Sequence, residues 1–547
     1  MKCSECQNEI PAGSVFCPVC GSAQFGEPVE VISRPVAEEK AEAVPATEES
    51  KPAPKKKKWW ILAVAAGVLA VVVALALVLF TGSQPGYGVY SAGGSVFLTN
   101  LSGGEPVMLM EYGSCTDLVM SADQKHLFYR ARKAATQIQL LFHLDLQSTS
   151  KEPEVLVENA GQFYVSADGT RVTYIRDGNL YVHNLKSQKR IAENVSEFLC
   201  DDDVDTFAYT ATKLGGRDIV LDRALFFWDG DVETRIVGNA RKDVKMLCLS
   251  TDGKTLIYSV DDKLYAWKNN ESVLIAENTS PESKVFEDGT FYYRVENDAG
   301  VRSYCFYDGE KSIDITAAQN VRVISGTEPM LTWQEKNDGP CYLAIRDQVL
   351  EIPLENADGI TLSEDGRRIC ITSWGEDGKS DLYCASLSSE GLGQLQLLAQ
   401  DEWRCLVWFV GERLYYWTGE PLKPGTLYCD GEEILQDVKM EILVHPETGT
   451  LLVPGKETSK FEREVFMVRH GEVIQLTDKG KYLRFATNGD ALVGLNATGD
   501  VAQLWRFDQK GKGTLLAKDV TGIYVIGEPR QPSSKIYWVD GPISSFW

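Results

Sequence analysis

The sequence predicts a mainly β protein, in which a β-propeller region follows a single transmembrane helix and a small metal-binding segment. Three observations lead to this class. A turn-and-strand pattern recurs roughly every 40 residues after Tyr87. An uncharged apolar run fills 59–80, and four cysteines lie within the first 20 residues. The propeller is expected to form either one large ring or two rings in tandem.

The first 26 residues carry two Cys-x-x-Cys pairs, Cys3 with Cys6 and Cys17 with Cys20. Two residues between the cysteines let one tight turn present both sulfurs, and two such turns can place four thiolates around one zinc ion. The segment has few large apolar side chains, so the metal would supply its folding energy. A redox dithiol would not explain the second pair, and a reducing cytoplasm disfavours a disulfide.

This cysteine spacing resembles the short zinc-ribbon domains at the N-termini of many bacterial membrane proteins. The resemblance covers residues 2–23 of the predicted domain 1–26. It implies one structural zinc ion, with no open coordination position for catalysis, held by Cys3, Cys6, Cys17 and Cys20. Because the segment has a single basic residue, it is expected to contact a cytoplasmic protein rather than nucleic acid.

Residues 27–58 are rich in Glu, Ala, Pro and Val without periodicity, and they end in a run of four lysines at 55–58. A composition of this kind is typical of a disordered or semi-extended tether. We therefore expect no stable fold between the ribbon and the apolar run, and a basic stretch directly beside the membrane.

The apolar run 59–80 reads WWILAVAAGVLAVVVALALVLF and contains no charge. As a helix it would be about 33 Å long, enough to cross a hydrocarbon core of about 30 Å. A buried core helix is seldom apolar on every face, and a signal peptide has a shorter apolar region nearer the N-terminus. Since lysines precede the run and uncharged residues follow it, the positive-inside rule predicts a single pass through the cell membrane. The N-terminus would be cytoplasmic and the C-terminal region extracytoplasmic.

Charge and composition describe the region beyond the span. The chain has 547 residues, of which 44% are hydrophobic and 24% charged, so most of it can bury an apolar core. The net charge is −23, and the first 58 residues hold 8 basic and 9 acidic side chains, so nearly all the excess negative charge lies beyond them. Such a surface repels phosphate backbones, and nucleic acid is not an expected partner.

Residues 86–547 repeat one pattern, most clearly in SADGTRVTYIRDGNLYVHNL from Ser166 and STDGKTLIYSVDDKLYAWKN from Ser250. Asp-Gly pairs accept the positive φ angles of hairpin turns, and the alternating residues that follow suit strands. Four short strands fill each copy, as in a propeller blade. About eleven copies favour two tandem rings, with a junction near 308–327, over one large ring. If one ring closes, the strand-like segments at Gly94 and Lys535 would complete a blade together.

The S-x-D-G…Y…G-x-L-Y pattern resembles the TolB-like and WD-type propeller repeats of bacterial envelope proteins, and this resemblance covers 87–547. It implies a propeller fold and no particular ligand. We therefore expect a non-enzymatic binding, scaffold or sensor protein, whose propeller binds a protein, peptide or glycan outside the membrane. The alternative is an envelope glycan or peptide hydrolase with a propeller active site. No G-x-S-x-G elbow occurs, and no catalytic residue is assigned.

A few further residues carry weaker expectations. Nine cysteines follow the span, and several replace small apolar residues at one strand position, so they are expected to be buried free thiols. The aspartates of 201–205 could ligate calcium, although they coincide with a blade turn. Trp374 falls on a predicted loop and could touch a ligand. Trp267 and Trp417 occupy repeat positions and are expected in the core, and His183 is expected to be an ordinary strand residue.

Overall fold

The computed structural model divides the chain into two compact units, Met1–Phe80 and Thr81–Trp547, and describes residues of the second from 86 to 527. Gaps in this description fall at 134–137, 215–219, 241–243, 281–284, 286–287, 298–299, 317–320, 325–328, 335–339, 355, 376, 389–390, 446, 460–461 and 499–500. The predicted zinc ribbon, tether and transmembrane helix lie outside the described residues. Among the residues that are described, no helix has the length and hydropathy needed to cross a membrane.

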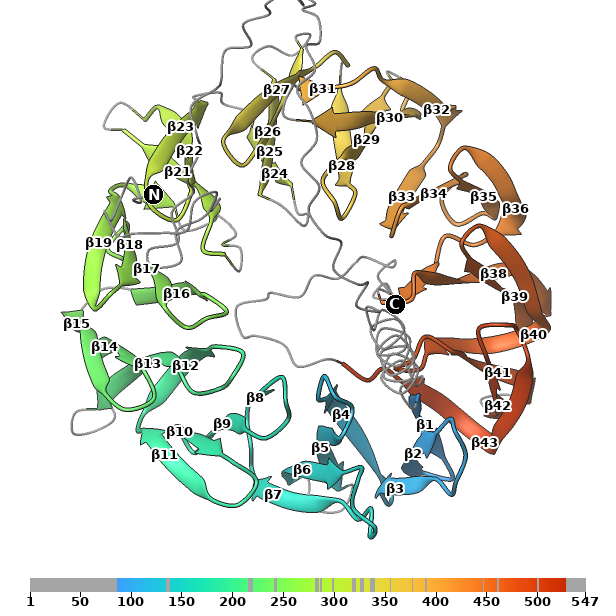
Figure 1. Ribbon diagram of the computed structural model, residues 1–547, viewed down its shortest axis with the longest axis horizontal. Coiled ribbons are helices and arrows are strands. Elements are labelled where there is room, and N and C mark those ends of the chain that lie inside the picture. Colours follow the sequence, from blue (N-terminus) through green and yellow to red (C-terminus); the bar gives the residue numbers. More distant parts are fainter. Residues whose placement is uncertain are drawn as a thin grey trace, which may run out of the picture. The chain divides into compact units, whose positions relative to one another are not determined.

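The regular elements of the described residues are strands, arranged in antiparallel sheets that mostly contain four of them. Eight sheets are separate. A ten-stranded sheet contains three more four-stranded units, because the long strands β40 (Glu472–Phe485) and β43 (Gly513–Tyr524) each serve two units. The described strands thus form eleven units, consistent with the blades of a β-propeller, and we number them blades 1–11 along the chain (Figure 1).

The strands of the first five blades have the following bounds. Blade 1 joins the end of β43 to β1 (Tyr87–Ala92), β2 (Ser95–Asn100) and β3 (Val107–Met110); blade 2 holds β4 (Gly113–Met120), β5 (His126–Lys133), β6 (Gln139–Asp145) and β7 (Glu154–Glu158); blade 3 holds β8 (Phe163–Val165), β9 (Val172–Arg176), β10 (Asn179–His183) and β11 (Gln188–Ala192); blade 4 holds β12 (Val195–Cys200), β13 (Phe207–Leu214), β14 (Val220–Trp228) and β15 (Glu233–Ala240); blade 5 holds β16 (Val244–Leu249), β17 (Thr255–Val260), β18 (Lys263–Lys268) and β19 (Glu271–Ala276).

The remaining blades follow in the same order. Blade 6 holds β20 (Thr279–Ser280), β21 (Phe291–Glu296), β22 (Arg302–Tyr307) and β23 (Ser312–Thr316); blade 7 holds β24 (Val321–Ile324), β25 (Met330–Gln334), β26 (Cys341–Ile345) and β27 (Gln348–Ile352); blade 8 holds β28 (Ala357–Leu362), β29 (Arg368–Trp374), β30 (Ser380–Ser388), β31 (Gly391–Leu392) and β32 (Gln396–Glu402); blade 9 holds β33 (Cys405–Val410), β34 (Arg413–Thr418), β35 (Gly425–Cys429) and β36 (Glu432–Val438); blade 10 holds β37 (Leu443–His445), β38 (Thr450–Ser459), β39 (Glu462–Arg469) and the start of β40; blade 11 holds the end of β40, β41 (Ala491–Thr498), β42 (Val501–Phe507) and the start of β43.

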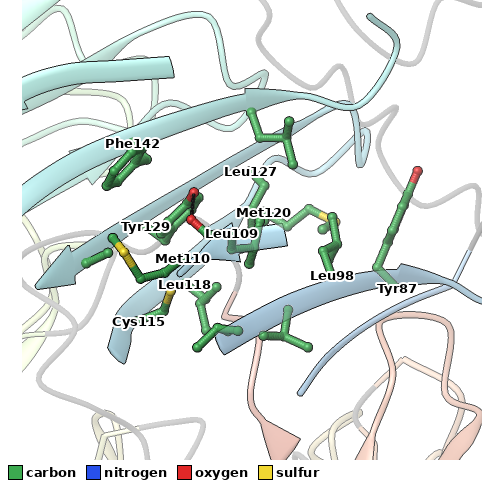
Figure 2. Packing of buried hydrophobic residues seen from close by; sticks show 14 of the residues in the cluster. Tyr87, Leu98, Leu109, Met110, Cys115, Leu118, Met120, Leu127, Tyr129 and Phe142 are labelled. Carbon is green, nitrogen blue, oxygen red and sulfur yellow. Dashed lines mark hydrogen bonds between the residues drawn. The ribbon is translucent and has the colours of Figure 1, made fainter. Parts of the chain in front are cut away.

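Apolar clusters join each blade to the next. Within the described residues there are eleven of them, one at each blade boundary, including the boundary between blades 11 and 1. Figure 2 shows the cluster in which Leu98 and Leu109 of blade 1 pack against Leu127 and Tyr129 of blade 2. The Tyr129 hydroxyl also donates a hydrogen bond of 2.9 Å to the Leu109 carbonyl oxygen across this boundary. The blades therefore follow one another in a single closed circuit.

The boundary between blades 6 and 7 bears directly on the expected tandem arrangement. Here Tyr292 and Phe306 of blade 6 pack with Leu331 and Trp333 of blade 7 in one buried cluster. The segment 308–327 lies between these residues in the chain, so the apolar core continues across it as it does at the other boundaries. A junction between two rings near 308–327, which the sequence analysis favoured, is not found there.

The two ends of the described chain meet in blade 1. The second half of β43 pairs antiparallel with β1, from Tyr524 opposite Val89 to Val520 opposite Ala92. Blade 1 therefore takes one strand from the C-terminal side of the chain and three from the N-terminal side, as closure of a single ring requires. The segment at Lys535, which the sequence analysis considered for this role, lies outside the described residues.

The Ser-x-Asp-Gly motif folds as a tight turn between the first two strands of a blade. In blade 5 the Ser250 hydroxyl donates to an Asp252 carboxylate oxygen at 2.7 Å and accepts the Thr255 N–H at 2.9 Å. The same carboxylate oxygen accepts the Lys254 N–H at 3.1 Å, and Gly253 has a φ of 67°. The Ser250 hydrogen bond is the main cause that lowers the pKa of Asp252 to about 2. Equivalent serine–aspartate hydrogen bonds of 2.6–2.7 Å occur at Ser121, Ser166 and Ser363.

Neighbouring turns are also bonded to each other. The Ala122 N–H donates to the Ala167 carbonyl oxygen at 2.9 Å. The Ala167 N–H donates in turn to the Asp202 carbonyl oxygen at 3.2 Å. The Asp202 N–H donates to the Thr251 carbonyl oxygen at 3.5 Å. One end of blades 2–5 thus carries a chain of backbone hydrogen bonds that runs from blade to blade.

Replacement of Trp417 by alanine tests the packing between blades 9 and 10. Trp417 is fully buried in the cluster at this boundary, and its indole N–H donates to the Val438 carbonyl oxygen at 3.0 Å. We expect Trp417→Ala to lower the free energy of unfolding by about 3–5 kcal/mol, measured by circular dichroism in a urea titration of the full-length protein. The control is Trp403→Ala, at a side chain that is 49% exposed, which should cost less than about 1 kcal/mol. Equal losses of unfolding free energy in the two variants would contradict the packing of Trp417 between blades 9 and 10.

Candidate ligand-binding cleft

A cleft of about 740 Å³ lies between blades 7 and 8. Its lining comes from both blades and comprises Val321, Arg322, Thr332, Trp333, Gln334, Cys341, Asn356, Ala357, Trp374 and Gly375. Trp374 ends β29, whereas the turn that begins at Ser363 precedes the start of this strand. The cleft therefore opens at the end of blade 8 opposite to its Ser-x-Asp-Gly turn.

Trp374 is held in place by the backbone around it. It is the last residue of β29, where it pairs with Ser380 of β30, and its N–H donates to the Asn356 carbonyl oxygen at 3.2 Å. The following residue closes a short turn through a 2.7 Å hydrogen bond from Gly375 to the Lys379 carbonyl oxygen. The side chain is 38% exposed. The prediction that Trp374 lies on a loop is wrong, because strand pairing continues through this residue.

The other lining residues supply polar groups of several kinds. Arg322 and Asn356 are exposed at the cleft, and Gln334 is half-buried. Trp333 is only 5% exposed and stacks on Tyr342 with 5.6 Å between ring centroids, so it forms part of the wall. A guanidinium, two amides and an exposed indole can together bind hydroxyl, amide or carboxylate groups and cover an apolar ring face. Of the lining residues, only Trp374 is predicted from the sequence, because the others belong to no motif and meet only when blades 7 and 8 pack together.

The aspartates of 201–205 have a structural role in blade 4. Asp201 takes the place of the serine in the blade turn, and its carboxylate accepts the N–H groups of Asp205 at 3.0 Å and Thr206 at 3.1 Å. Burial raises the pKa of Asp201 to about 6. The Asp205 carboxylate pairs with Arg171 of blade 3 at 3.0 Å. No group of three or more potential metal ligands occurs in the described part of the chain.

Two histidines of blade 2 contact each other directly. The distance between His126 Nδ1 and His143 Nε2 is 3.0 Å. Burial, and then the neighbouring His126, lower the pKa of His143 to about 4. His183 ends β10 and its Nδ1 accepts the Leu185 N–H at 3.0 Å, so the expectation of an ordinary strand residue is confirmed.

The expected core positions of Trp267 and Trp417 are confirmed, with exposed fractions of 6% and 0%. The nine cysteines after the predicted span are free thiols in the structure. Seven are buried, as expected from the sequence, whereas Cys384 and Cys405 are half-buried. The four predicted zinc ligands of the N-terminal segment lie outside the described residues.

Comparison with known protein families assigns the N-terminal segment. Residues 2–24 match the zinc-ribbon domain family, so the chain carries an N-terminal zinc ribbon. This match confirms the ribbon predicted from the cysteine spacing. No curated protein matches the chain.

Several solved structures are similar to this chain at low sequence identity. A eukaryotic initiation factor is 9% identical with a TM-score of 0.39, over 81% of this chain and 98% of that one. A prolyl endopeptidase is 15% identical with a TM-score of 0.30, over 57% of this chain and 55% of that one. The β-propeller domain of the Trilobed protease from Pyrococcus furiosus is 14% identical with a TM-score of 0.25, over 59% of this chain and 97% of that one. The fold assignment rests on the strand topology of the chain itself.

The buried His143 predicts a pH dependence of stability. Because its pKa is lower in the folded than in the unfolded protein, its contribution is complete above about pH 6.5 and is lost as pH falls towards about 4. We expect His143→Gln to remove up to about 3 kcal/mol of the loss in unfolding free energy over this interval, measured by urea titrations at a series of pH values. The control is His470→Asn at an exposed position with a φ of 50°, which should keep the wild-type pH profile. If His143→Gln kept the wild-type dependence of unfolding free energy on pH, this would contradict the role given to His143.

Proposed function

We propose that this chain is a single-pass, membrane-anchored binding protein of scaffold or sensor type. In this proposal the propeller region captures a protein, peptide or glycan on the outer side of the cell membrane, and the zinc ribbon contacts a protein in the cytoplasm. The observation that carries the proposal is the cleft between blades 7 and 8, in which an exposed indole faces polar groups contributed by a second blade.

The size and lining of the cleft support the capture of a small part of a larger ligand. Ligand pockets commonly have volumes of about 300–1,000 Å³, and this cleft has about 740 Å³. The Trp374 indole offers a flat apolar surface for a sugar ring or a peptide side chain. Arg322, Gln334 and Asn356 offer hydrogen bonds that would orient the ligand. A peptide or oligosaccharide end fits these groups.

The N-terminal region supports the membrane and cytoplasmic parts of the proposal. Four thiols in two Cys-x-x-Cys pairs suit the preference of zinc for a closed tetrahedron of sulfur ligands, so Cys3, Cys6, Cys17 and Cys20 would hold the ion. A zinc ion bound there would supply folding energy to a segment with little apolar core. The uncharged run 59–80, preceded by four lysines, would cross the membrane with the ribbon on the cytoplasmic side.

Loss of the Trp374 indole should weaken ligand binding. We expect an array of oligosaccharides and peptides to yield at least one ligand for the full-length protein, and Trp374→Ala to raise its Kd roughly tenfold, because one stacked ring contributes about 1–1.5 kcal/mol. Trp403→Ala removes an exposed tryptophan that does not line the cleft and should leave the Kd unchanged. Unchanged binding by Trp374→Ala would exclude this cleft, and turnover of a bound glycan or peptide would favour the hydrolase alternative.

Cysteine labelling tests the proposed topology and the zinc site together. In intact cells a membrane-impermeant maleimide should label Ser83→Cys and give no added signal from the ribbon. After lysis, the four ribbon cysteines should react only once a chelator has removed zinc, because metal-bound thiolates are protected. The wild-type protein is the control for the Ser83→Cys signal. Labelling of the ribbon in intact cells would contradict the topology, and labelling in lysates without chelator would contradict bound zinc.

A further inference from the structure

Two cysteines of blade 8 face each other across adjacent strands. Cys370 of β29 and Cys384 of β30 are direct partners in the antiparallel register. Partners in such a pair have Cα atoms about 4.5–5.5 Å apart, within the span of about 4.4–6.8 Å that a disulfide bridges. Their side chains also share one face of the sheet. Among the strand registers of the described residues, no other cysteine stands opposite a cysteine.

The two thiols are register partners but differ in exposure. Cys370 is 1% exposed within the cluster between blades 8 and 9, whereas Cys384 is half-buried and reachable from solvent. Other thiols have different partners: Cys305 donates to an Asp314 carboxylate oxygen at 3.3 Å, and Cys405 accepts the Ser380 hydroxyl at 3.8 Å.

The surroundings favour the thiolate of Cys384. The neighbouring Cys370 thiol lowers the pKa of Cys384, and so does the positive charge of Arg368, although burial and Asp430 oppose them. Arg368 lies two residues before Cys370 on the same strand, and its guanidinium is held over the Phe409 ring at 5.0 Å. The neighbouring Cys384, and then burial, raise the pKa of Cys370, which stays a thiol. An accessible thiolate beside a buried second thiol is the usual arrangement of a redox-active cysteine pair.

We propose that Cys370 and Cys384 form a redox-active dithiol that reacts with disulfides and is oxidised to a cross-strand disulfide. The oxidant is a disulfide, either of a small molecule or of a thiol–disulfide oxidoreductase. The Cys384 thiolate attacks one sulfur of the oxidant, which forms a mixed disulfide and releases the first thiolate. Cys370 then loses its proton and attacks the Cys384 sulfur, so the second thiolate leaves. Two electrons pass to the oxidant, which becomes two thiols.

This dithiol is independent of the proposed ligand binding, since it needs only the β29–β30 register. The two features nevertheless share one hairpin, because Trp374 ends the strand that carries Cys370. The disulfide would join the strands on either side of the turn at 375–379. Oxidation would thereby fix the hairpin that lines one wall of the cleft.

Oxidised glutathione is a direct probe of this proposal. The reduced full-length protein is incubated with it, the remaining thiols are blocked, and tryptic peptides are analysed by mass spectrometry without reduction. Cleavage after Arg368 and Lys379 separates the two cysteines, so a disulfide between them links two peptides. We expect this linked pair in the wild type, with the loss of two hydrogens per chain. A folded protein that forms no such linked peptide would overturn the proposal.

Single variants identify which thiol reacts first. In Cys370→Ser, glutathione should remain on Cys384 as a mixed disulfide, whereas Cys384→Ser should take up no glutathione at Cys370. Cys405→Ser is the matched control, because Cys405 is also half-buried and lies in the same cluster, and it should form the linked peptide as the wild type does. Circular dichroism establishes that each variant is folded, and Cys370→Ala replaces Cys370→Ser if that variant is not. Glutathione retained on Cys370 in Cys384→Ser would overturn the order of attack.

Discussion

Each four-stranded sheet of this protein buries apolar side chains on both of its faces, and this requires the row of blades to close on itself. In β17, Leu256 and Tyr258 pack towards blade 4, whereas Ile257 between them packs towards blade 6. An open row would leave one apolar face of its first and last sheets in water. Pairing of β1 with the end of β43 avoids this, since it completes blade 1 and brings Leu504 of blade 11 into a cluster with Tyr90.

Much of this architecture could be read from the sequence, because the local pattern and the global packing agree. The Ser-x-Asp-Gly turns mark where several blades begin, and the full set of repeat copies, about eleven with the weaker ones included, predicted the number of blades. The way the ring closes could not be predicted. The apolar residues at the boundary near 308–327 are of the same types as those at other boundaries, so nothing in the sequence distinguishes one ring from two. The closing segment 520–524 carries no repeat motif, so its pairing with β1 is recognised only in the folded chain.

The cleft and the cysteine pair differ in how far the sequence predicts them. Trp374 stood out as an unusual aromatic residue, but Arg322 and Asn356 join it only because blades 7 and 8 pack side by side. The cysteine pair was missed for another reason. Cys384 occupies a repeat position at which other blades carry small apolar residues, so the sequence predicts a buried thiol there, and the repeat pattern does not relate it to Cys370. Each lies four residues from its end of the hairpin turn, so aligning the two strands around this turn would have found the pair.

The shared strand at the ring closure has a consequence for how the protein is made. Val89 and Tyr524 pair although more than 400 residues separate them, so blade 1 stays incomplete until nearly the whole chain has been synthesised. Until then β1 presents an unpaired edge and blade 11 an uncovered apolar face, which are the features that promote aggregation of folding intermediates. The last of the described strands to be synthesised therefore removes both of these features at once, because it pairs with β1 and completes the sheet that covers blade 11.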